Sequence, residues 1–247
     1  MWFAVGPRTA GKGGLPPRLA GKAPMTLPIS PYHKPGFYAE ALAKGRHRDI
    51  VGGRWDETGR AQMALLLAEG LQPHHHLLDI GAGSLRLGCK AVPYLDPGHY
   101  WATDLSGALM AAGHAQELTD PTRLDPAHLV EDADFSFPGI PDTISHAIAF
   151  AVFTHLPLPH LLHALNRIHH HFPALQRLFF TVFLCPPGHV GAFRQPDGVV
   201  SHPARAPYHF EPSAVLDLTR SAGFDAHFTD ARLPRGQTLC IARRATG

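Results

Sequence analysis

Two carboxylates and a glycine-containing turn lie where a parallel sheet would bind a ligand. Asp79 is near the end of the apolar run 76–81, the turn 81–83 (Gly-Ala-Gly) follows, and Asp104 ends the next apolar run, 99–104. Glycine lets a backbone approach a ligand closely, and the helix that follows offers free N–H groups. A carboxylate at the tip of the second strand can accept hydrogen bonds from both ribose hydroxyls. A lone glycine turn is often only structural, but strand, turn, helix, strand and Asp in this order favour a nucleoside site.

The residue at position 86 narrows the class of nucleoside. A dinucleotide fingerprint GxGxxG that begins at Gly81 needs glycine at position 86, where the chain has Arg86. In such sites the glycines bring the backbone against a pyrophosphate and allow close helix–strand packing. Arg86 therefore argues against NAD or FAD and favours a ligand without phosphates, such as S-adenosylmethionine.

Further segments resemble one known family in the same order along the chain. They are LLDIGAGSLRLG (77–88), YWATDLS (100–106), LVEDADF (129–135), AFAVFTHLP (149–157), PYHFEPSAVLDLTRSAGF (207–224) and RGQTLCIARR (235–244). From about Arg48 to Arg244 the chain thus resembles the class I, seven-stranded, Rossmann-like S-adenosylmethionine-dependent methyltransferases. The stretch VGGRWDETG (51–59) also resembles a segment that precedes the first strand in some bacterial members.

The resemblance implies a place around the cofactor for ten residues. Those that would contact its methionine part and its ribose are Asp79, Gly81, Ala82, Gly83 and Asp104. Those that would contact its adenine are Leu105 and either Asp132 or Ala133. Phe150 and Ala151 would face the sulfonium and the methyl acceptor, and Phe150 indicates an apolar wall there.

Two positions depart from the family pattern. The glycine turn of the family often reads GxGxG, but Leu85 stands at its last glycine. The acidic residue often found at the start of the fourth strand is Ser145 here. Neither change removes a contact to ribose or sulfonium, so the expectation of a cofactor site stands.

His155 is the candidate general base. It follows the fourth apolar run, at the edge of the sheet where ligands of such folds bind. An imidazole with its ordinary pKa of about 6.5 accepts a proton near neutral pH. The alternative is that His155 caps the following helix or satisfies a loop carbonyl, and the two roles remain open.

The acceptor pocket is expected to involve the long proline-rich loop 185–207 and the residues after it, Tyr208, His209 and Glu211. A rigid, solvent-facing connection with Glu211 in the first turn of a helix is an equally good interpretation. Before the first strand, Gly52 and Gly53 are candidates for a lid, whereas Trp55 is expected to pack in the core.

The elements that must position these residues alternate along the chain. Expected strands are 76–81, 99–104, 127–132, 145–150, 177–183, 224–230 and 237–243. Expected helices are 36–45, 56–70, 84–92, 106–117, 158–171 and 211–222, with Asp56 as an N-cap. This pattern predicts an α/β three-layer sandwich with a mostly parallel seven-stranded sheet. The connection between the last two strands is too short for a crossover helix, so they should form a C-terminal antiparallel hairpin at one edge.

Composition limits the classes of partner. The 22 Lys and Arg residues against 20 Asp and Glu give a net charge of +2, which does not favour a nucleic-acid groove. No apolar run is long enough to span a membrane, and 3 widely spaced cysteines fit a reducing cytoplasm. The histidine triplets 74–76 and 169–171 lack the spacing of metal ligands, so no metal site is expected.

We therefore expect three segments and one activity. Residues 1–24 read as a disordered extension, 25–75 as an N-terminal helical cover, and 76–247 as the S-adenosylmethionine-binding methyltransferase domain. The expected reaction moves a methyl group by in-line displacement to an O or N atom of a small molecule. A protein or peptide acceptor, a nucleotide-binding oxidoreductase, and a cofactor-binding domain that has lost transfer are the alternatives.

Overall fold

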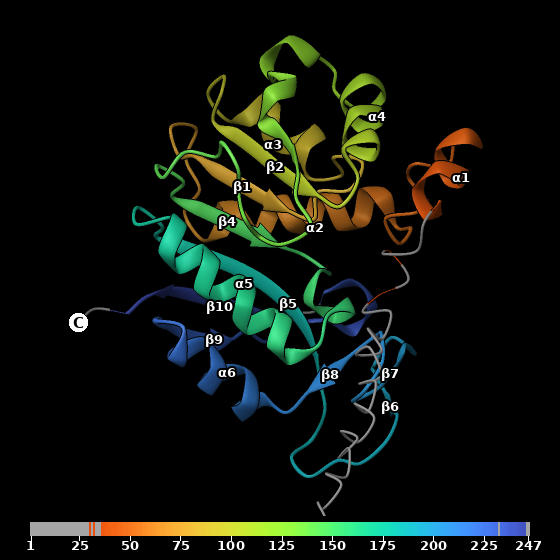
Figure 1. Ribbon diagram of the computed structural model, residues 1–247, viewed down its shortest axis with the longest axis vertical. Coiled ribbons are helices and arrows are strands. Elements are labelled where there is room, and N and C mark those ends of the chain that lie inside the picture. The colour runs from red at the N-terminus through yellow and green to blue at the C-terminus, as the bar shows by residue number, and fades with distance from the viewer. Residues whose placement is uncertain (1–29, 31, 33–35, 232, 246–247) are drawn as a thin grey trace, which may run out of the picture.

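A central sheet with helices on both faces forms the molecule, as the computed structural model of residues 30, 32, 36–231 and 233–245 shows (Figure 1). The strand order is β3-β2-β1-β4-β5-β10-β9, and β8 pairs with β5 outside this path. Strands β1 to β5 pair in parallel, whereas β10 is antiparallel to both β5 and β9. The expected fold class, a mostly parallel seven-stranded sheet with a C-terminal antiparallel hairpin, is confirmed.

The helices are α1 (Phe37–Ala43), α2 (Trp55–Ala68), α3 (Gly88–Tyr94), α4 (Gly107–Glu117), α5 (Leu158–His171) and α6 (Pro212–Ser221). The long strands are β1 (Leu77–Ile80), β2 (Tyr100–Asp104), β4 (His146–Ala149), β5 (Arg177–Leu184), β9 (Phe224–Phe228) and β10 (Thr238–Arg244). The short strands are β3 (Leu129–Glu131), β6 (Phe193–Arg194), β7 (Val200–Ser201) and β8 (His209–Phe210).

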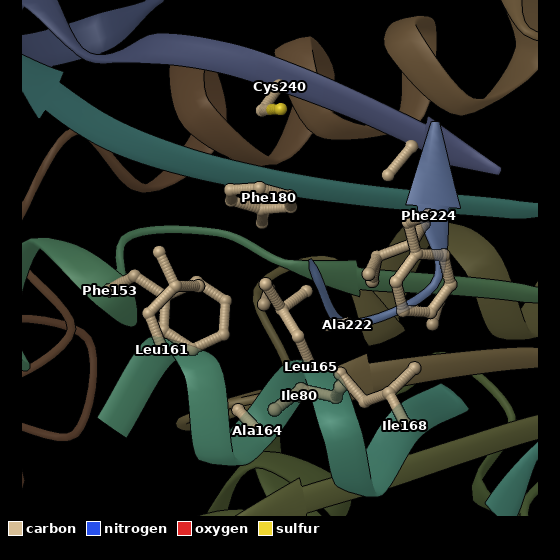
Figure 2. Close-up of a cluster of buried hydrophobic side chains, with 14 of the residues drawn as sticks. Ile80, Phe153, Leu161, Ala164, Leu165, Ile168, Phe180, Ala222, Phe224 and Cys240 are labelled. Carbon is tan, nitrogen blue, oxygen red and sulfur yellow. The ribbon is translucent and has the colours of Figure 1, made fainter. Parts of the chain in front are cut away.

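Alternation along the strands divides the apolar side chains between two cores. Leu78 and Ala147 point to the face covered by α5 and α6, whereas Leu77 and Ile148 point to the face covered by α2, α3 and α4. Figure 2 shows the first of these cores, where one side of α5 packs against Phe180 of β5. Because both faces are covered, the central strands β1 and β4 are buried throughout. Since β1 to β5 are parallel, their carboxyl ends lie on the same side of the sheet.

The last strand of the chain belongs to the C-terminal hairpin, and it lies inside the sheet rather than at its edge. Strand β10 lies between β5 and β9, so β9 is the edge strand. The hairpin β6–β7 and the strand β8 were not expected. Each is only two residues long, which is too short for a periodic signal.

Two helix starts differ from the sequence expectation. Helix α2 begins at Trp55, with Arg54 at the cap position, so the assignment of Asp56 as N-cap was wrong. Asp56 lies in the first turn instead, where a carboxylate still favours the helix. Helix α3 begins at Gly88 rather than near position 84, because residues 84–87 continue the turn that follows β1.

The N-terminal part that the structure describes contributes α1 and α2, and Leu66 of α2 packs in the same core as Leu77. The expected extension 1–24 lies outside the described residues. Among the helices described, none is both long and apolar enough to cross a bilayer. Cys89, Cys185 and Cys240 are all free thiols.

Candidate active site

All eleven residues predicted to form the site line one cavity of about 530 Å³. It opens where β1, β2 and β4 end, which is the edge where open α/β sheets bind their ligands. The eleven are Asp79, Gly81, Ala82, Gly83, Asp104, Leu105, Asp132, Ala133, Phe150, Ala151 and His155. The structure therefore brings these residues together, and their roles remain proposals.

The turn after β1 needs glycine at two positions. Gly81 has φ +72° and Gly83 has φ +59°, a region that L-residues rarely adopt. A Cβ at Gly81 would lie 2.5 Å from Val152 Cγ2, and one at Gly83 would lie 2.4 Å from Val51 Cγ1. These glycines therefore let neighbouring loops close onto the turn.

Leu85 adopts a glycine-like backbone conformation at the position where the family pattern has its last glycine. Its φ is 61°, so the backbone keeps the left-handed conformation that glycine would adopt. An L-residue there costs about 1–2 kcal/mol. The side chain is fully buried in the core under α2 and α3, and this burial offsets the cost.

Asp104, at the end of β2, connects the glycine turn to α4. Its Oδ2 accepts a hydrogen bond from the Gly83 N–H at 2.9 Å, and its Oδ1 accepts one from the Ser106 N–H at 3.0 Å. Burial raises the pKa of Asp104 to about 6, although these N–H donors oppose the shift. Each carboxylate oxygen keeps a further lone pair that can accept a hydroxyl from a ligand.

Asp79 lies deeper, beneath the turn. Its Oδ2 accepts the Tyr100 hydroxyl at 2.8 Å, and Gly88 leaves room for that hydroxyl, since a Cβ there would approach it to 3.0 Å. Burial raises the pKa of Asp79 to about 7, against the opposing effects of Tyr100 and Arg86. Two carboxyls with raised pKa values thus face one cavity, an arrangement typical of functional sites.

Asp132 shapes the loop after β3. Its Oδ2 accepts the Phe137 N–H at 2.8 Å, and its Oδ1 accepts the Asp134 N–H and the Ser136 hydroxyl, each at 3.0 Å. Its carboxylate is therefore engaged within its own loop. Ala133, beside it, is exposed toward the cavity.

The loop after β4 forms an apolar wall. Phe150 is buried, and Ala151 has φ 62°. The Ala151 N–H donates to Thr181 Oγ1 at 2.7 Å, and the Thr181 hydroxyl donates to Gln237 Oε1 at 2.5 Å. This chain of hydrogen bonds fixes the loop to β5 and to the start of β10.

His155 lies in the same wall, edge-on to Tyr32 at 4.9 Å between ring centroids. Its Nδ1 is buried and has no hydrogen-bond partner among the described residues. Burial, assisted by the nearby Arg235 charge, lowers the pKa of His155 to about 4. The ring is therefore neutral at physiological pH, and it is a weaker base than an ordinary histidine.

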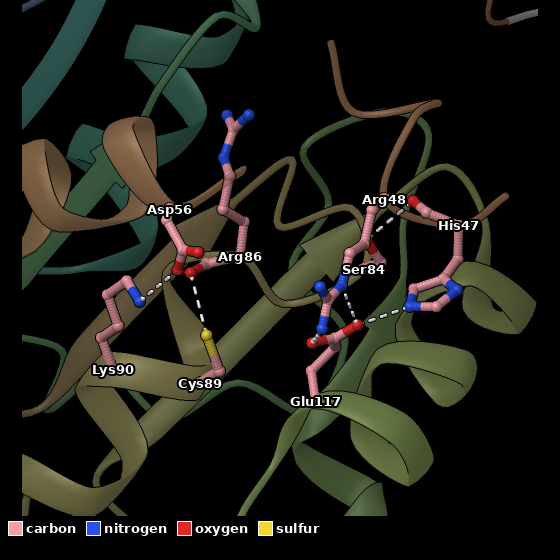
Figure 3. Close-up of polar contacts among 8 residues, drawn as sticks. All are labelled: His47, Arg48, Asp56, Ser84, Arg86, Cys89, Lys90 and Glu117. Carbon is pink, nitrogen blue, oxygen red and sulfur yellow. Dashed lines mark hydrogen bonds and ion pairs between the residues drawn. The ribbon is translucent and has the colours of Figure 1, made fainter. Parts of the chain in front are cut away.

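The N-terminal segment closes over the glycine turn, and Figure 3 shows how it is fixed there. Arg48 donates to both carboxylate oxygens of Glu117 at 2.7 and 2.6 Å, and His47 Nε2 lies 2.5 Å from Glu117 Oε1. The Ser84 hydroxyl donates to the His47 carbonyl at 2.9 Å. These contacts join the segment before α2 to the end of α4 and to the turn itself.

Several cavity residues were missed in the sequence analysis. They come from the N-terminal segment, from α2, from the glycine turn and from the turn before β10: Tyr32, Tyr38, Thr58, Gln62, Arg86 and Arg235. These residues have no fixed spacing relative to the glycine turn, so no motif predicts them. Arg86 served only as an argument against a dinucleotide site.

The loop 51–53 is held by two guanidinium groups. Arg86 is 8% exposed and donates to the Val51 carbonyl at 2.9 Å, while Arg235 donates to the Gly52 carbonyl. Gly52 lines the cavity whereas Gly53 does not, and the lid stays a prediction. Trp55 is half-buried at the start of α2, with its ring centroid 5.2 Å from the Arg48 guanidinium carbon. It belongs to neither core, so the expectation that it packs in the core was wrong.

The residues after the long loop have structural contacts. His209 Nδ1 lies 2.9 Å from the Ser201 hydroxyl, and Glu211 accepts the Gly188 N–H at 2.9 Å. Of this region only Val199 and Pro207 line the cavity. Tyr208, His209 and Glu211 do not line the cavity, so their expected part in the acceptor pocket was wrong. The alternative was also wrong in its details, because Tyr208 and His209 are buried rather than solvent-facing and Glu211 is the N-cap residue of α6.

The first histidine triplet packs at the opposite edge of the sheet. His75 stacks on His146 at 4.4 Å and His76 on His99 at 4.0 Å. Within the part of the chain that the structure describes, no group of three or more His, Cys, Asp or Glu residues has the arrangement of a metal site.

Comparison with known proteins defines the class of fold. No protein-family profile matches the sequence. Magnesium protoporphyrin IX methyltransferase from Synechocystis, solved with bound S-adenosylmethionine, is 15% identical with a TM-score of 0.54, over 87% of this chain and 93% of that one. A Burkholderia thailandensis 1,6-didemethyltoxoflavin-N1-methyltransferase, solved with S-adenosylhomocysteine, is 21% identical with a TM-score of 0.57, over 85% and 86%.

Human N-acetylserotonin methyltransferase is also similar, at 17% identity and a TM-score of 0.58, over 87% of this chain and 61% of that one. The chain therefore has the class I methyltransferase fold, and the resemblance read from its motifs is confirmed at the level of fold.

Proposed function

We propose that this protein is an S-adenosylmethionine-dependent methyltransferase that transfers a methyl group to an O or N atom of a small molecule. One observation carries the proposal: the residues that the family motifs assign to the cofactor all line a single cavity at the carboxyl edge of the sheet. All three of the structures compared above hold S-adenosylmethionine or S-adenosylhomocysteine. The cover over the cavity, with Tyr32 and Tyr38 in its lining, favours a small acceptor over a peptide.

The cavity fits the parts of this cofactor. Asp104, Leu105 and Ala133 line the cavity, and we assign the ribose hydroxyls to Asp104 and the adenine to Leu105 and Ala133. Near the glycine turn, Gln62 Oε1 and Arg86 Nε are buried without hydrogen-bond partners among the described residues. An amino acid's ammonium group can donate to the first and its carboxylate can accept from the second. We assign the methionine part of the cofactor to this end.

Methyl transfer from a sulfonium mainly requires that the reacting groups are correctly positioned. When bound, the cofactor supplies an activated methyl group on a sulfonium. Holding two reactants in line can contribute up to ~7–11 kcal/mol to catalysis in the best intramolecular cases. The apolar wall at Phe150 and Ala151 would exclude water from the reacting atoms, and their loop is fixed through Thr181. His155 is the proposed catalytic contact to the acceptor, either as a base or as a positioning hydrogen-bond partner.

Calorimetric titration with S-adenosylhomocysteine and with NAD tests the proposal. We expect micromolar binding of S-adenosylhomocysteine to the wild-type protein, a collapse of that binding in Asp104→Ala, and no binding of NAD. Asp142→Ala, an exposed carboxylate outside the cavity, is the matched control and should bind as the wild type does. Binding of NAD alone would instead support an oxidoreductase and overturn the methyltransferase assignment.

A further inference from the structure

The ionisable residues that line the cavity are unevenly distributed between its two halves. The carboxylates come from the ends of β1, β2 and β3: Asp79, Asp104, Asp132 and Asp134. The other half is built from the loops after β4 and β5 and from the turn before β10, and its one formal charge among the described lining residues is Arg235. The half proposed for the cofactor also contains Arg86, but its four carboxylates make it acidic overall, whereas the half that remains for the acceptor is cationic.

Arg235 is held in place by its backbone. Its φ of 67° belongs to the turn Pro234–Gly236, and its N–H donates to Asp197 Oδ2 at 2.8 Å. Its guanidinium donates to the Gly52 carbonyl, which occupies one of five N–H donors. Within the described residues no carboxylate forms an ion pair with this guanidinium, and the side chain is exposed at the cavity. An anchored, uncompensated cation in a pocket is suited to binding an anion.

The rest of the lining of this half is mostly apolar and offers no strong base. Phe183, Val199 and Pro207 line this half, with His155 and Tyr32 beside them. The His155 ring is neutral and has its pKa lowered to about 4, so it poorly accepts a proton from an alcohol. An acceptor that is already ionised needs no such proton transfer.

We propose that the acceptor is a small organic anion, with an apolar body and a carboxylate or phenolate oxygen that Arg235 binds. This assignment rests on the proposed function. The acceptor oxygen would bond to the methyl carbon as the carbon–sulfur bond breaks, and the electron pair of that bond would stay on sulfur. A negative acceptor and a positive sulfonium give a neutral methyl ester or ether and a neutral thioether, with no proton to remove. Because opposite charges vanish together, a dry, apolar wall favours the step.

Binding of simple aromatic anions to the complex with S-adenosylhomocysteine tests this assignment. The probes are benzoate and 4-nitrophenolate, each compared with the neutral benzamide, measured by calorimetry at pH 8. We expect the wild-type complex to bind at least one anion and to bind benzamide about tenfold or more weakly. Arg235→Gln should lose about tenfold or more of the anion affinity, and Arg235→Lys should lose less. Arg205→Gln, an exposed arginine outside the cavity, is the matched control.

The outcomes separate the two proposals. Absence of S-adenosylhomocysteine binding to the wild type would overturn the proposed function itself. If S-adenosylhomocysteine binds but neither anion binds better than benzamide, only the anionic acceptor is overturned. Loss of S-adenosylhomocysteine affinity in Arg235→Gln, with its fold intact by circular dichroism, would assign Arg235 to the cofactor and overturn it as well. The difference between the benzoate and 4-nitrophenolate arms identifies which oxyanion the site prefers.

Discussion

The two halves of the cavity are built by different means. In the acidic half, backbone N–H groups of neighbouring turns hold Asp104 and Asp132 in place, and all the carboxylates follow consecutive strands. In the half around Arg235, the lining comes from segments far apart in the chain, and the side chains are neutral apart from one guanidinium. The half proposed for the cofactor can be preformed by the sheet, whereas the half proposed for the acceptor depends on how loops and cover meet above it.

The largest effect on stability and binding is expected from a methyl group added to the acidic half of the cavity. In Gly83→Ala, the positive φ costs about 1–2 kcal/mol, and the contact with Val51 adds about 1–3 kcal/mol. A shifted turn would also move the N–H that positions Asp104, so we expect S-adenosylhomocysteine binding to weaken by about 100-fold. Urea unfolding and calorimetry measure the two effects.

Gly139→Ala separates the cost of the positive φ from the cost of the steric contact. Gly139 has φ +75°, but a Cβ there would meet nothing within 4 Å. This variant should lose about 1–2 kcal/mol of stability and none of its cofactor affinity. Equal binding losses in both variants would show that the turn at Gly83 has no special part in the site.

Ligand affinity in the acidic half of the cavity should depend on pH, whereas affinity in the half around Arg235 should not. Because the pKa of Asp104 is raised to about 6, its ionised form is lost as the pH falls below 6. Hydroxyl donors favour the ionised form, so affinity for S-adenosylhomocysteine should fall about tenfold between pH 8 and pH 5. Calorimetry across this range should show the fall in the wild type and a uniformly weak affinity in Asp104→Asn. A wild-type affinity independent of pH would contradict the role of Asp104.

The same raised pKa has a consequence for folding. A carboxyl whose pKa is higher in the folded than in the unfolded protein contributes stability below pH 3.8, and this contribution is lost as the pH rises through about 6. Asp79, with a pKa of about 7, acts in the same direction. Both carboxylates therefore cost stability at neutral pH, which is consistent with groups kept for a ligand.

A smaller effect should come from Gln62, at the methionine end of the acidic half. Gln62 is 4% exposed and its Oε1 has no partner among the described residues. Gln62→Met removes a buried, unsatisfied acceptor at similar volume, so the protein alone should gain about 1 kcal/mol of stability. Binding of S-adenosylhomocysteine should weaken about five- to tenfold, because the ammonium group loses an acceptor. Gln116→Met, an exposed position on α4, should change neither quantity.

The acidic half could be predicted from the sequence because its residues follow consecutive strands. A right-handed parallel crossover brings successive strand ends side by side, so Asp79 and Asp104 had to meet. In the half around Arg235, Phe150, Ala151 and His155 could be predicted in the same way because they follow the fourth strand, but Arg235 gave no such signal. The contact between Gly52 and Arg235 joins residues 183 positions apart, and neither residue belongs to a periodic pattern.

Local backbone conformations could not be predicted from the sequence where tertiary packing determines them. Leu85 adopts a glycine-like φ because its side chain fills the core, which no propensity scale would anticipate. The delayed start of α3 follows from the same turn. The role of Arg86 shows a similar limit, since its spacing excluded one ligand but did not indicate the loop that it holds.

The smallest effect on the cofactor should come from His155, and it sharpens the division between the halves. His155→Ala should change the affinity for S-adenosylhomocysteine less than about twofold, because this ring lies in the wall assigned to the acceptor. With a pKa of about 4, the imidazole should remain neutral from pH 8 to pH 5, which nuclear magnetic resonance of wild type and variant can follow. Protonation of His155 near pH 6.5 would restore it as a strong candidate base and would weaken the case for an acceptor that is already ionised.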